Sequence, residues 1–155
     1  MRWFRRATKK PRSIKPLNLN DPPLPQRGLL ARRIRVFHIC AADCGACAAE
    51  VWAAVEGSPD LSWAPTPQSA DVVVLTGAIP TPIRSAIQNV HAQLLADQLP
   101  LIVVGRCAID GHPFAKGGVA ALPEIAVRRK VDGCPPQPSA IVEAVLKATQ
   151  PIPEV

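Results

Sequence analysis

Two short, continuous apolar runs constrain the fold of this chain more than any other feature of its sequence. Residues 71–77 are Asp-Val-Val-Val-Leu-Thr-Gly, and residues 101–105 are Leu-Ile-Val-Val-Gly. Both runs have the length of a strand, are rich in β-branched residues and end at glycine, and neither alternates between apolar and polar residues. Such strands are typical of parallel sheets that are covered by helices on both faces.

Helical and extended segments alternate around these two runs. Period-two alternation predicts a first strand, and apolar residues spaced three or four apart predict helices. The remaining predicted elements are a strand over 33–39, a weak strand near 61–64, and helices over 46–55, 81–97 and 139–148. We therefore predict an α/β fold, a small three-layer α/β/α flavodoxin-like domain with a mainly parallel sheet of about four strands.

Charge and proline content separate the beginning of the chain from the rest. Residues 1–35 hold eleven Lys and Arg against one acid, a net charge of +10, whereas the remaining residues carry −4. We predict a basic, proline-containing arm over 1–31, the folded domain over 32–150 and a tail over 151–155. The arm is either a solvated tail or a contact for anionic lipid or an acidic partner surface. No nucleic-acid-binding motif accompanies it.

Hydropathy and cysteine content indicate the cellular setting. No apolar run approaches the ~18–20 residues of a membrane helix, and no apolar segment follows the N-terminal charges as in a signal peptide. We therefore expect a soluble, unprocessed, cytoplasmic protein. Five cysteines in such a chain indicate a metal or catalytic role and not disulfides.

The cysteines lie where the predicted strands end. Cys40, Cys44 and Cys47 follow the first strand, Cys107 follows the run at 101–105, and Cys134 lies in the loop before the last helix. Because the carboxyl ends of parallel strands meet at one edge of a sheet, we expect these cysteines to converge. Glycines flank the last two, which allows backbone to approach a bulky inorganic group. Four thiolates can hold a cubane iron–sulfur cluster or a structural zinc ion.

Two competing interpretations use the same cysteines. Structural zinc usually stabilises small domains that lack a core, and this chain has strands and helices enough for one. The spacing Cys40-x3-Cys44-x2-Cys47 is that of radical S-adenosylmethionine enzymes, but Ala46 stands where they usually carry an aromatic residue, and 155 residues are too few for their barrel. We favour the cluster, keep zinc as the alternative, and predict that Cys40 packs as a small buried apolar residue.

The sequence around the cysteines resembles that of one protein family. This family comprises the small subunit of energy-converting NiFe hydrogenases and its relative, the 20 kDa (PSST/B) subunit of NADH:quinone oxidoreductase. The resemblance covers roughly residues 33–148, and Gly-Cys-Pro-Pro-x-Pro over residues 133–138 is its most specific element. The other matching segments are His38-Ile39, 44–51, 69–78 with Arg84-Ser85, and 105–107. The resemblance implies one 4Fe–4S cluster on a flavodoxin-like domain, close to a catalytic large subunit.

Matched residue by residue, the resemblance implies four cluster ligands and one nearby acid. The ligands are Cys44, Cys47, Cys107 and Cys134. Glu50 matches an acidic position near the large-subunit interface, and its place about one helical turn after Cys47 suits an interface or proton-handling role. Arg84 and His112 are candidates for the same roles, with a surface arginine and a solvated loop histidine as the plainer interpretations. His38 is predicted to be a hydrogen-bonded core or edge residue.

Departures from the family pattern bear on the branch and on the cluster's surroundings. Complex I subunits usually have adjacent cysteines at the first motif, so the CxxC of Cys44 and Cys47 favours the hydrogenase branch. Gly45-Ala46 replaces the usual Asn-Gly, and residues 108–113 replace a stretch that is usually richer in glycine. These changes leave the ligands intact and alter the hydrogen bonds that tune a cluster.

The function expected from the sequence is that of an electron-transfer subunit, not catalytic by itself, in a membrane-associated oxidoreductase complex. The expected partners are a large subunit that is NiFe-hydrogenase-like or quinone-reducing, a ferredoxin-like iron–sulfur subunit, and membrane subunits, with the complex on the cytoplasmic face of the inner membrane. A complex I-type subunit that passes electrons to quinone is the alternative within this class. A non-redox zinc-binding or scaffold subunit is the alternative from another class.

Overall fold

A five-stranded sheet forms the centre of the domain in the computed structural model, which describes residues 32–96, 99–114 and 117–150. Its strands are β1 (Ile34–Cys40), β2 (Leu61–Trp63), β3 (Val72–Thr76), β4 (Leu101–Val104) and β5 (Arg129–Val131). All neighbours are parallel, in the order β2-β1-β3-β4-β5. This is the strand order of flavodoxin-like folds. The predicted α/β class is confirmed, with five strands instead of about four.

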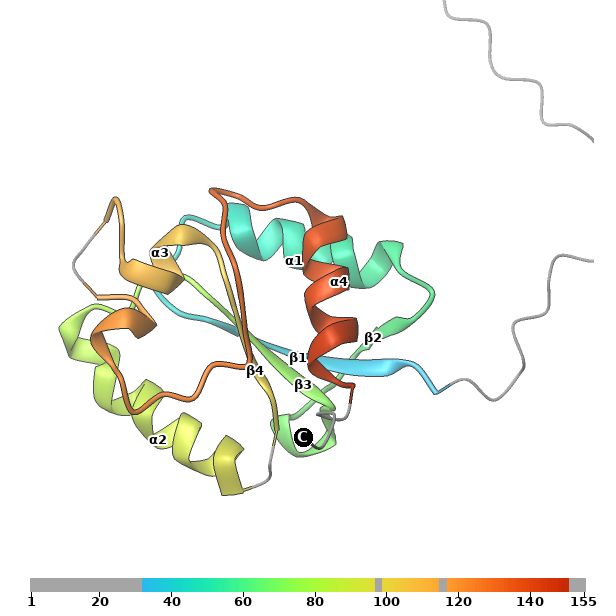
Figure 1. The fold of residues 1–155 in the computed structure, drawn as a ribbon, viewed down its shortest axis with the longest axis horizontal. Helices are drawn as coiled ribbons and strands as arrows, with labels where there is room; N and C mark the ends of the chain where they lie inside the picture. Colours follow the sequence, from blue (N-terminus) through green and yellow to red (C-terminus); the bar gives the residue numbers. More distant parts are fainter. Residues whose placement is uncertain (1–31, 97–98, 115–116, 151–155) are drawn as a thin grey trace, which may run out of the picture. The chain divides into compact units, whose positions relative to one another are not determined.

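Helices cover both faces of the sheet (Figure 1). They are α1 (Ala46–Gly57), α2 (Arg84–Ala96), α3 (Arg106–Asp110) and α4 (Pro138–Ala148), with 3-10 turns η1 (Pro67–Ser69), η2 (Thr81–Ile83) and η3 (Val119–Ala121). α1 and α4 lie on one face and α2 on the other. The helix predicted to begin at Thr81 begins three residues later, because residues 81–83 form the η2 turn.

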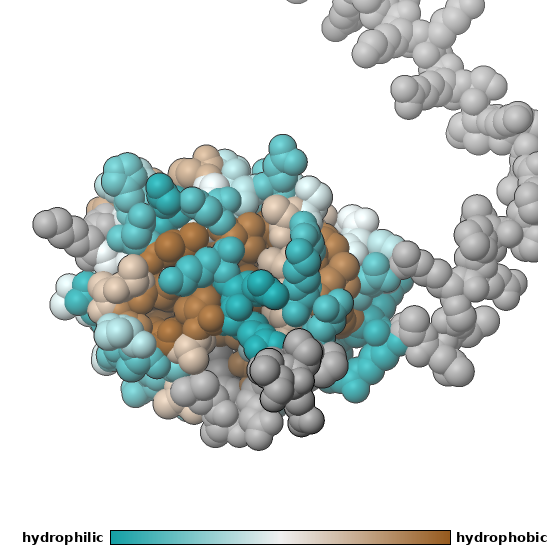
Figure 2. Space-filling view, viewed as in Figure 1, coloured by the Kyte–Doolittle hydropathy of each residue, from teal (hydrophilic) through white to brown (hydrophobic). Residues whose placement is uncertain are grey.

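The core has two layers, one on each face of the sheet. Successive residues of a strand point to opposite faces, so each buried strand contributes side chains to both layers of the core. Val72, Val74, Ile102 and Val104 pack with α1 and α4. On the other face, α2 and η3 pack with Val73, Leu75, Leu101 and Val103. Burial on both faces explains why the two apolar runs show no alternation. Figure 2 shows apolar residues across the middle of one face of the domain, with hydrophilic residues around them.

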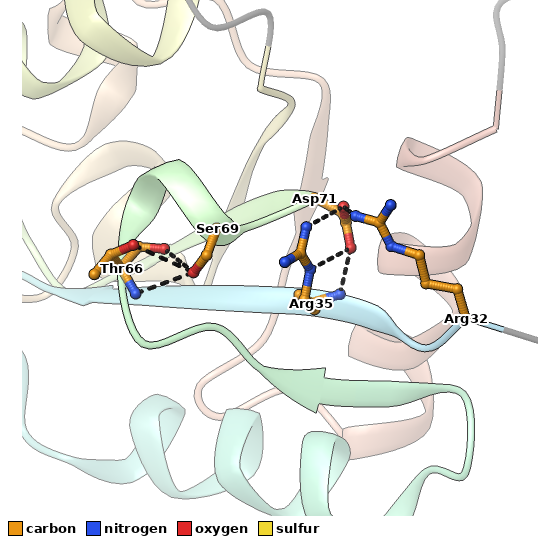
Figure 3. A network of polar contacts seen from close by, with 5 residues as sticks. All are labelled: Arg32, Arg35, Thr66, Ser69 and Asp71. Atoms are coloured by element: carbon orange, nitrogen blue, oxygen red, sulfur yellow. Dashed lines mark hydrogen bonds and ion pairs between the residues drawn. The ribbon is translucent and has the colours of Figure 1, made fainter.

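Two polar clusters fix the start of β3 at the amino end of the sheet (Figure 3). The Arg35 N–H donates to Asp71 Oδ2 at 2.8 Å, and the guanidinium groups of Arg35 and Arg32 pair with the same carboxylate. Thr66 and Ser69 form a reciprocal capping box around η1. These contacts lie at the amino ends of the strands, whereas the cysteines lie at their carboxyl ends. They therefore belong to the scaffold and not to the candidate site.

Three features differ from the sequence prediction or lie outside the described residues. No strand was predicted near residue 129, yet Arg129 begins the edge strand β5, whose backbone pairs with β4 while the side chains of Arg129 and Lys130 stay exposed. The segment after β4 contains the short helix α3, which was not among the predicted helices. The predicted arm over 1–31 and tail over 151–155 lie outside the described residues.

Candidate metal centre

The cysteines lie at the carboxyl ends of the strands, as predicted. Cys40 is the last residue of β1, and Cys44 and Cys47 lie in the turn into α1 and in its first turn. Cys107 lies in α3, two residues after Gly105, where β4 has ended. Cys134 follows β5 by three residues. Because β1, β3, β4 and β5 are consecutive parallel neighbours, these segments share one edge of the sheet.

Four of the five cysteines lie close enough for their charges to act on one another. Burial, followed by the charges of Cys107, Cys134 and Cys44, raises the pKa of Cys47 to about 12. Burial also raises the pKa of Cys107, and Cys134 and Cys44 add to the effect, although the Ala108 N–H opposes it. Cys47 and Cys107 are buried, whereas Cys44 and Cys134 are exposed. The four residues therefore form one group with two buried and two open members.

Cys40 does not belong to this group. Its charge is not among the main influences on the pKa of Cys47 or Cys107. The prediction that Cys40 is buried is wrong: the residue is exposed, because β1 ends there and its Sγ lies at the rim of the sheet, 3.8 Å from the Ala41 carbonyl oxygen.

Glycine backbone closes around Cys47 from the ends of β4 and β5. Gly105 has φ of 97°, and a Cβ added to it would lie 2.5 Å from Cys47 Sγ. The Gly105 N–H donates to the Val131 carbonyl at 2.9 Å, and the Arg106 N–H donates to the Gly133 carbonyl at 2.9 Å. Only a residue without a side chain fits between β4 and this thiol. Backbone can therefore approach whatever the thiols hold.

The loop before Cys44 contains a polar network that sequence reasoning missed. The Thr76 hydroxyl donates to Asp43 Oδ2 at 2.8 Å, and the Gly45 N–H donates to Asp43 Oδ1 at 2.8 Å. His38 Nε2 lies 2.9 Å from Thr76 Oγ1, in agreement with its predicted role as a hydrogen-bonded residue. The sequence contains one signal for this network, an Asp-x-Gly turn directly before a helix.

The structure brings two of the three further candidates together. Arg84 and His112 line a pocket of about 720 Å³ together with Asp110, whose Oδ1 accepts the His112 N–H at 2.9 Å. Glu50 is half-buried on α1, one turn after Cys47, and does not line this pocket. Roles for these residues in proton handling or at an interface stay predictions.

Another buried polar residue, His91 of α2, has a structural role. Its side chain is 5% exposed, and its Nε2 accepts the Ala126 N–H at 2.9 Å. The sequence signal is its position four residues after Ile87, on the apolar side of the helix. The imidazole ties the loop before β5 to α2 and lies apart from the cysteine group.

The donor set is compatible with a cubane cluster. Among the described residues, no three His, Cys, Asp or Glu side chains are placed to hold one metal ion. In a cubane each thiolate binds a different iron, so the four sulfurs stand around the cluster and not around a single ion. Four neighbouring thiols, with a glycine where a side chain would collide with one of them, fit that requirement.

Comparisons with known proteins give relatives in two kinds of complex. Over 123 residues the chain is 28% identical to the probable membrane-bound hydrogenase subunit mbhJ of Pyrococcus furiosus, covering 74% of this chain and 73% of the relative. Over 87 residues it is 36% identical to a subunit of the NADH-quinone oxidoreductase of Heliobacterium modesticaldum, covering 54% of this chain and 49% of the relative. The chain therefore spans about half the length of that relative. It is also 29% identical over 125 residues to the uncharacterized protein MJ0516 of Methanocaldococcus jannaschii, covering 74% of this chain and 84% of the relative.

A solved structure supports the fold. A chain in the oxidized-state structure of recombinant NiFeSe hydrogenase from Desulfovibrio vulgaris Hildenborough aligns with a TM-score of 0.54 at 18% identity. The alignment covers 77% of this chain and 60% of that chain. In the described part of this chain, no helix has both the length and the apolar character needed to cross a bilayer.

The family match covers every cysteine described above. Residues 38–148 match the family described as "NADH ubiquinone oxidoreductase, 20 Kd subunit". This span runs from late β1 to the end of α4, so it includes the whole carboxyl edge of the sheet. The resemblance predicted from the sequence is confirmed, and the chain belongs to the family of the 20 kDa subunit of NADH ubiquinone oxidoreductase.

Proposed function

We propose that this chain is an electron-transfer subunit that binds one 4Fe–4S cluster through Cys44, Cys47, Cys107 and Cys134. The observation that carries the proposal is the convergence of these four thiols, from three separate segments, on one edge of the sheet. When bound, the cluster supplies a one-electron redox couple. The protein residues hold it, limit its contact with water and set the charge around it.

A partner surface is needed to complete this site. Cys44 and Cys134 are exposed, so a group held by them would lie at the surface of the isolated chain. This exposure supports a catalytic large subunit against this edge. The proposed assembly also contains a ferredoxin-like iron–sulfur subunit and membrane subunits, on the cytoplasmic face of the inner membrane.

Two types of complex remain as candidates for this assembly. The CxxC of Cys44 and Cys47 supports a hydrogenase-like large subunit. So does the relative whose alignment covers 74% of this chain, which is named as a probable membrane-bound hydrogenase subunit. The 36% identical relative, named as part of an NADH-quinone oxidoreductase, supports a quinone-reducing large subunit. We favour the hydrogenase-like complex and keep quinone reduction as the second candidate.

The cluster is tested by anaerobic purification and reconstitution of the whole chain. We expect a brown protein with about four irons and four acid-labile sulfides per chain, and a fast-relaxing electron paramagnetic resonance signal after reduction. Cys107→Ser and Cys134→Ser should lose the signal. Cys40→Ser is the matched control and should keep it. A colourless protein that holds one zinc ion per chain would contradict the proposal and support the non-redox alternative.

The branch is tested by the large subunit that co-purifies with the tagged chain from its own cells. Two CxxC pairs in that subunit, bound nickel and hydrogen-dependent reduction of a viologen dye would support the hydrogenase-like complex. A large subunit without these cysteine pairs, in a preparation that reduces quinone with NADH, would support the second candidate.

A further inference from the structure

Asp43 is anchored by side-chain and backbone donors from two directions. Its Oδ2 accepts the hydroxyl proton of Thr76, which is fully buried at the end of β3, and its Oδ1 accepts the N–H of Gly45, the residue that caps α1. Both bonds are 2.8 Å long. Each favours the ionised carboxylate, because a donor that points at an oxygen stabilises its negative charge.

His38 extends this anchor into β1. The Thr76 hydroxyl has one proton and gives it to Asp43, so Thr76 Oγ1 accepts a hydrogen bond from His38 Nε2, 2.9 Å away. This assigns the Nε2–H tautomer to His38. Burial lowers the pKa of His38, although Asp43 opposes the effect. The network therefore carries one net negative charge, on Asp43.

The backbone around Asp43 is also tied to β3. The Ala41 N–H donates to the Thr76 carbonyl at 2.8 Å, and the Ala78 N–H donates to the Ala42 carbonyl at 2.8 Å. Gly77 has φ of 89°, and a Cβ added to it would lie 2.8 Å from the Cβ of Asp43. These contacts fix the carboxylate in the residue that directly precedes Cys44 in the chain.

We propose that Asp43 is a positioning residue of the cluster site: it holds the loop of Cys44 and Cys47 in place and keeps one fixed negative charge beside the cluster, which lowers the cluster's reduction potential. This inference rests on the proposed function. Asp43 acts on the Cys47 thiol, and its charge adds to the rise in the pKa of Cys47 that burial and the neighbouring cysteines cause. Reduction adds an electron, and a nearby negative charge opposes that addition.

The size of the effect follows from Coulomb's law. For a unit charge taken to lie about 10 Å from a redox centre, at the effective dielectric constant of about 20 that describes protein sites, the formula gives a change of about tenfold in the equilibrium constant. Removing the charge of Asp43 should therefore raise the ratio of reduced to oxidised cluster about tenfold at a given potential. For a one-electron couple this equals a rise of about 59 mV in the midpoint.

The test compares Asp43→Asn with Glu56→Gln in the whole, cluster-loaded chain. Both variants change the net charge equally and keep a side-chain oxygen. Glu56 lies ten residues after Ala46 in α1, about 15 Å along the helix, and its carboxylate accepts only the Trp63 indole N–H among the bonds described. We follow a redox titration by electron paramagnetic resonance. At a given potential, we expect the ratio of reduced to oxidised cluster to rise about tenfold in Asp43→Asn and less than twofold in Glu56→Gln. Equal midpoints for Asp43→Asn and the wild type would overturn the proposal.

A second variant covers failure of the first to hold a cluster. Asp43→Ser removes the charge but can still accept the Gly45 N–H, as serine does in turns, and its midpoint is judged by the same criterion. Loss of the cluster in both variants, at an unchanged unfolding temperature, would support the positioning role. Loss accompanied by a lower unfolding temperature would overturn it. A wild-type chain that binds no cluster refutes the proposed function before Asp43 is tested.

Discussion

The contact between Gly105 and Cys47 gives the sharpest prediction about the site. Replacing Gly105 by alanine would place a methyl group 2.5 Å from Cys47 Sγ, well inside van der Waals distance, at φ of 97°. Neither side can move easily. The Gly105 N–H is bonded to the Val131 carbonyl, and Cys47 is 4% exposed within the first turn of α1.

Two costs determine the expected loss of stability. A non-glycine residue at this positive φ costs about 1–3 kcal/mol, and overpacking a closed core costs about 1–3 kcal/mol. We expect Gly105→Ala to lower the free energy of unfolding by about 3 kcal/mol. With a slope of about 1.5–2 kcal/mol per molar urea for a small domain, the unfolding midpoint falls by roughly 1.5–2 M.

Urea unfolding of the metal-free chain, followed by circular dichroism, measures this loss. Gly57→Ala is the matched control, because a Cβ at Gly57 meets nothing within 4 Å and Gly57 lies at the exposed end of α1. That change should stabilise the chain by about 0.4–1 kcal/mol or leave it unchanged. If Gly105→Ala costs less than about 1 kcal/mol, β4 and Cys47 do not meet as the structure shows. Gly105→Ala should also prevent cluster loading under the conditions used above.

Three further predictions concern pH and buried polar groups. Asp71 is partly buried, but its hydrogen bonds with Arg35 outweigh that effect and lower its pKa. Asp71→Asn should therefore cost about 1 kcal/mol at pH 7, and this cost should shrink as the pH falls through the lowered pKa of Asp71, in a series of urea titrations at decreasing pH. His91→Leu removes the acceptor of the Ala126 N–H and should cost about 1–3 kcal/mol by the same assay, and no loss would contradict the bond. Burial raises the pKa of Cys47 from 9.0 to about 12, so the folded chain favours the neutral thiol. Below pH 9 this thiol should not change the free energy of unfolding of the metal-free chain, and as the pH rises to 12 that free energy should fall by at most about 4 kcal/mol. Cys47→Ser should remove this fall.

The fold was predictable from sequence to the extent that burial leaves a pattern. Val72–Thr76 and Leu101–Val104 are buried on both faces, and their unbroken apolar runs indicated this directly. The closing helix was predicted within one residue of α4 (Pro138–Ala148) because its apolar spacing and its proline entry mark both ends. β5 was missed because an edge strand of three residues with exposed basic side chains has no such pattern.

The candidate site was predictable to the extent that topology alone brings residues together. The order of strands and loops along the chain is enough to place Cys44, Cys107 and Cys134 at one edge of the sheet. The network of Asp43 with Thr76 was not predictable, because it depends on the register in which Cys40 pairs with Thr76 across β1 and β3. Register is a tertiary property, and a shift by one residue would turn Thr76 to the other face of the sheet.

The position of Cys40 adds a structural argument against the radical S-adenosylmethionine pattern, which the sequence already disfavoured. A radical S-adenosylmethionine site would need Cys40, Cys44 and Cys47 to face one cluster. Here the charges of Cys107, Cys134 and Cys44 are the largest that act on Cys47, while Cys40 lies at the rim beside Asp43. Partial desolvation, followed by the hydrogen bond and the charge of Asp43, raises the pKa of Cys40. Asp43 opposes ionisation of Cys40, but it also acts on Cys47, so its charge alone does not distinguish the two cysteines. The distinction comes from position: Cys40 ends β1 at the rim of the sheet, whereas Cys47 lies with Cys44, Cys107 and Cys134. Cys40→Ser should therefore leave loading of the proposed cluster unchanged.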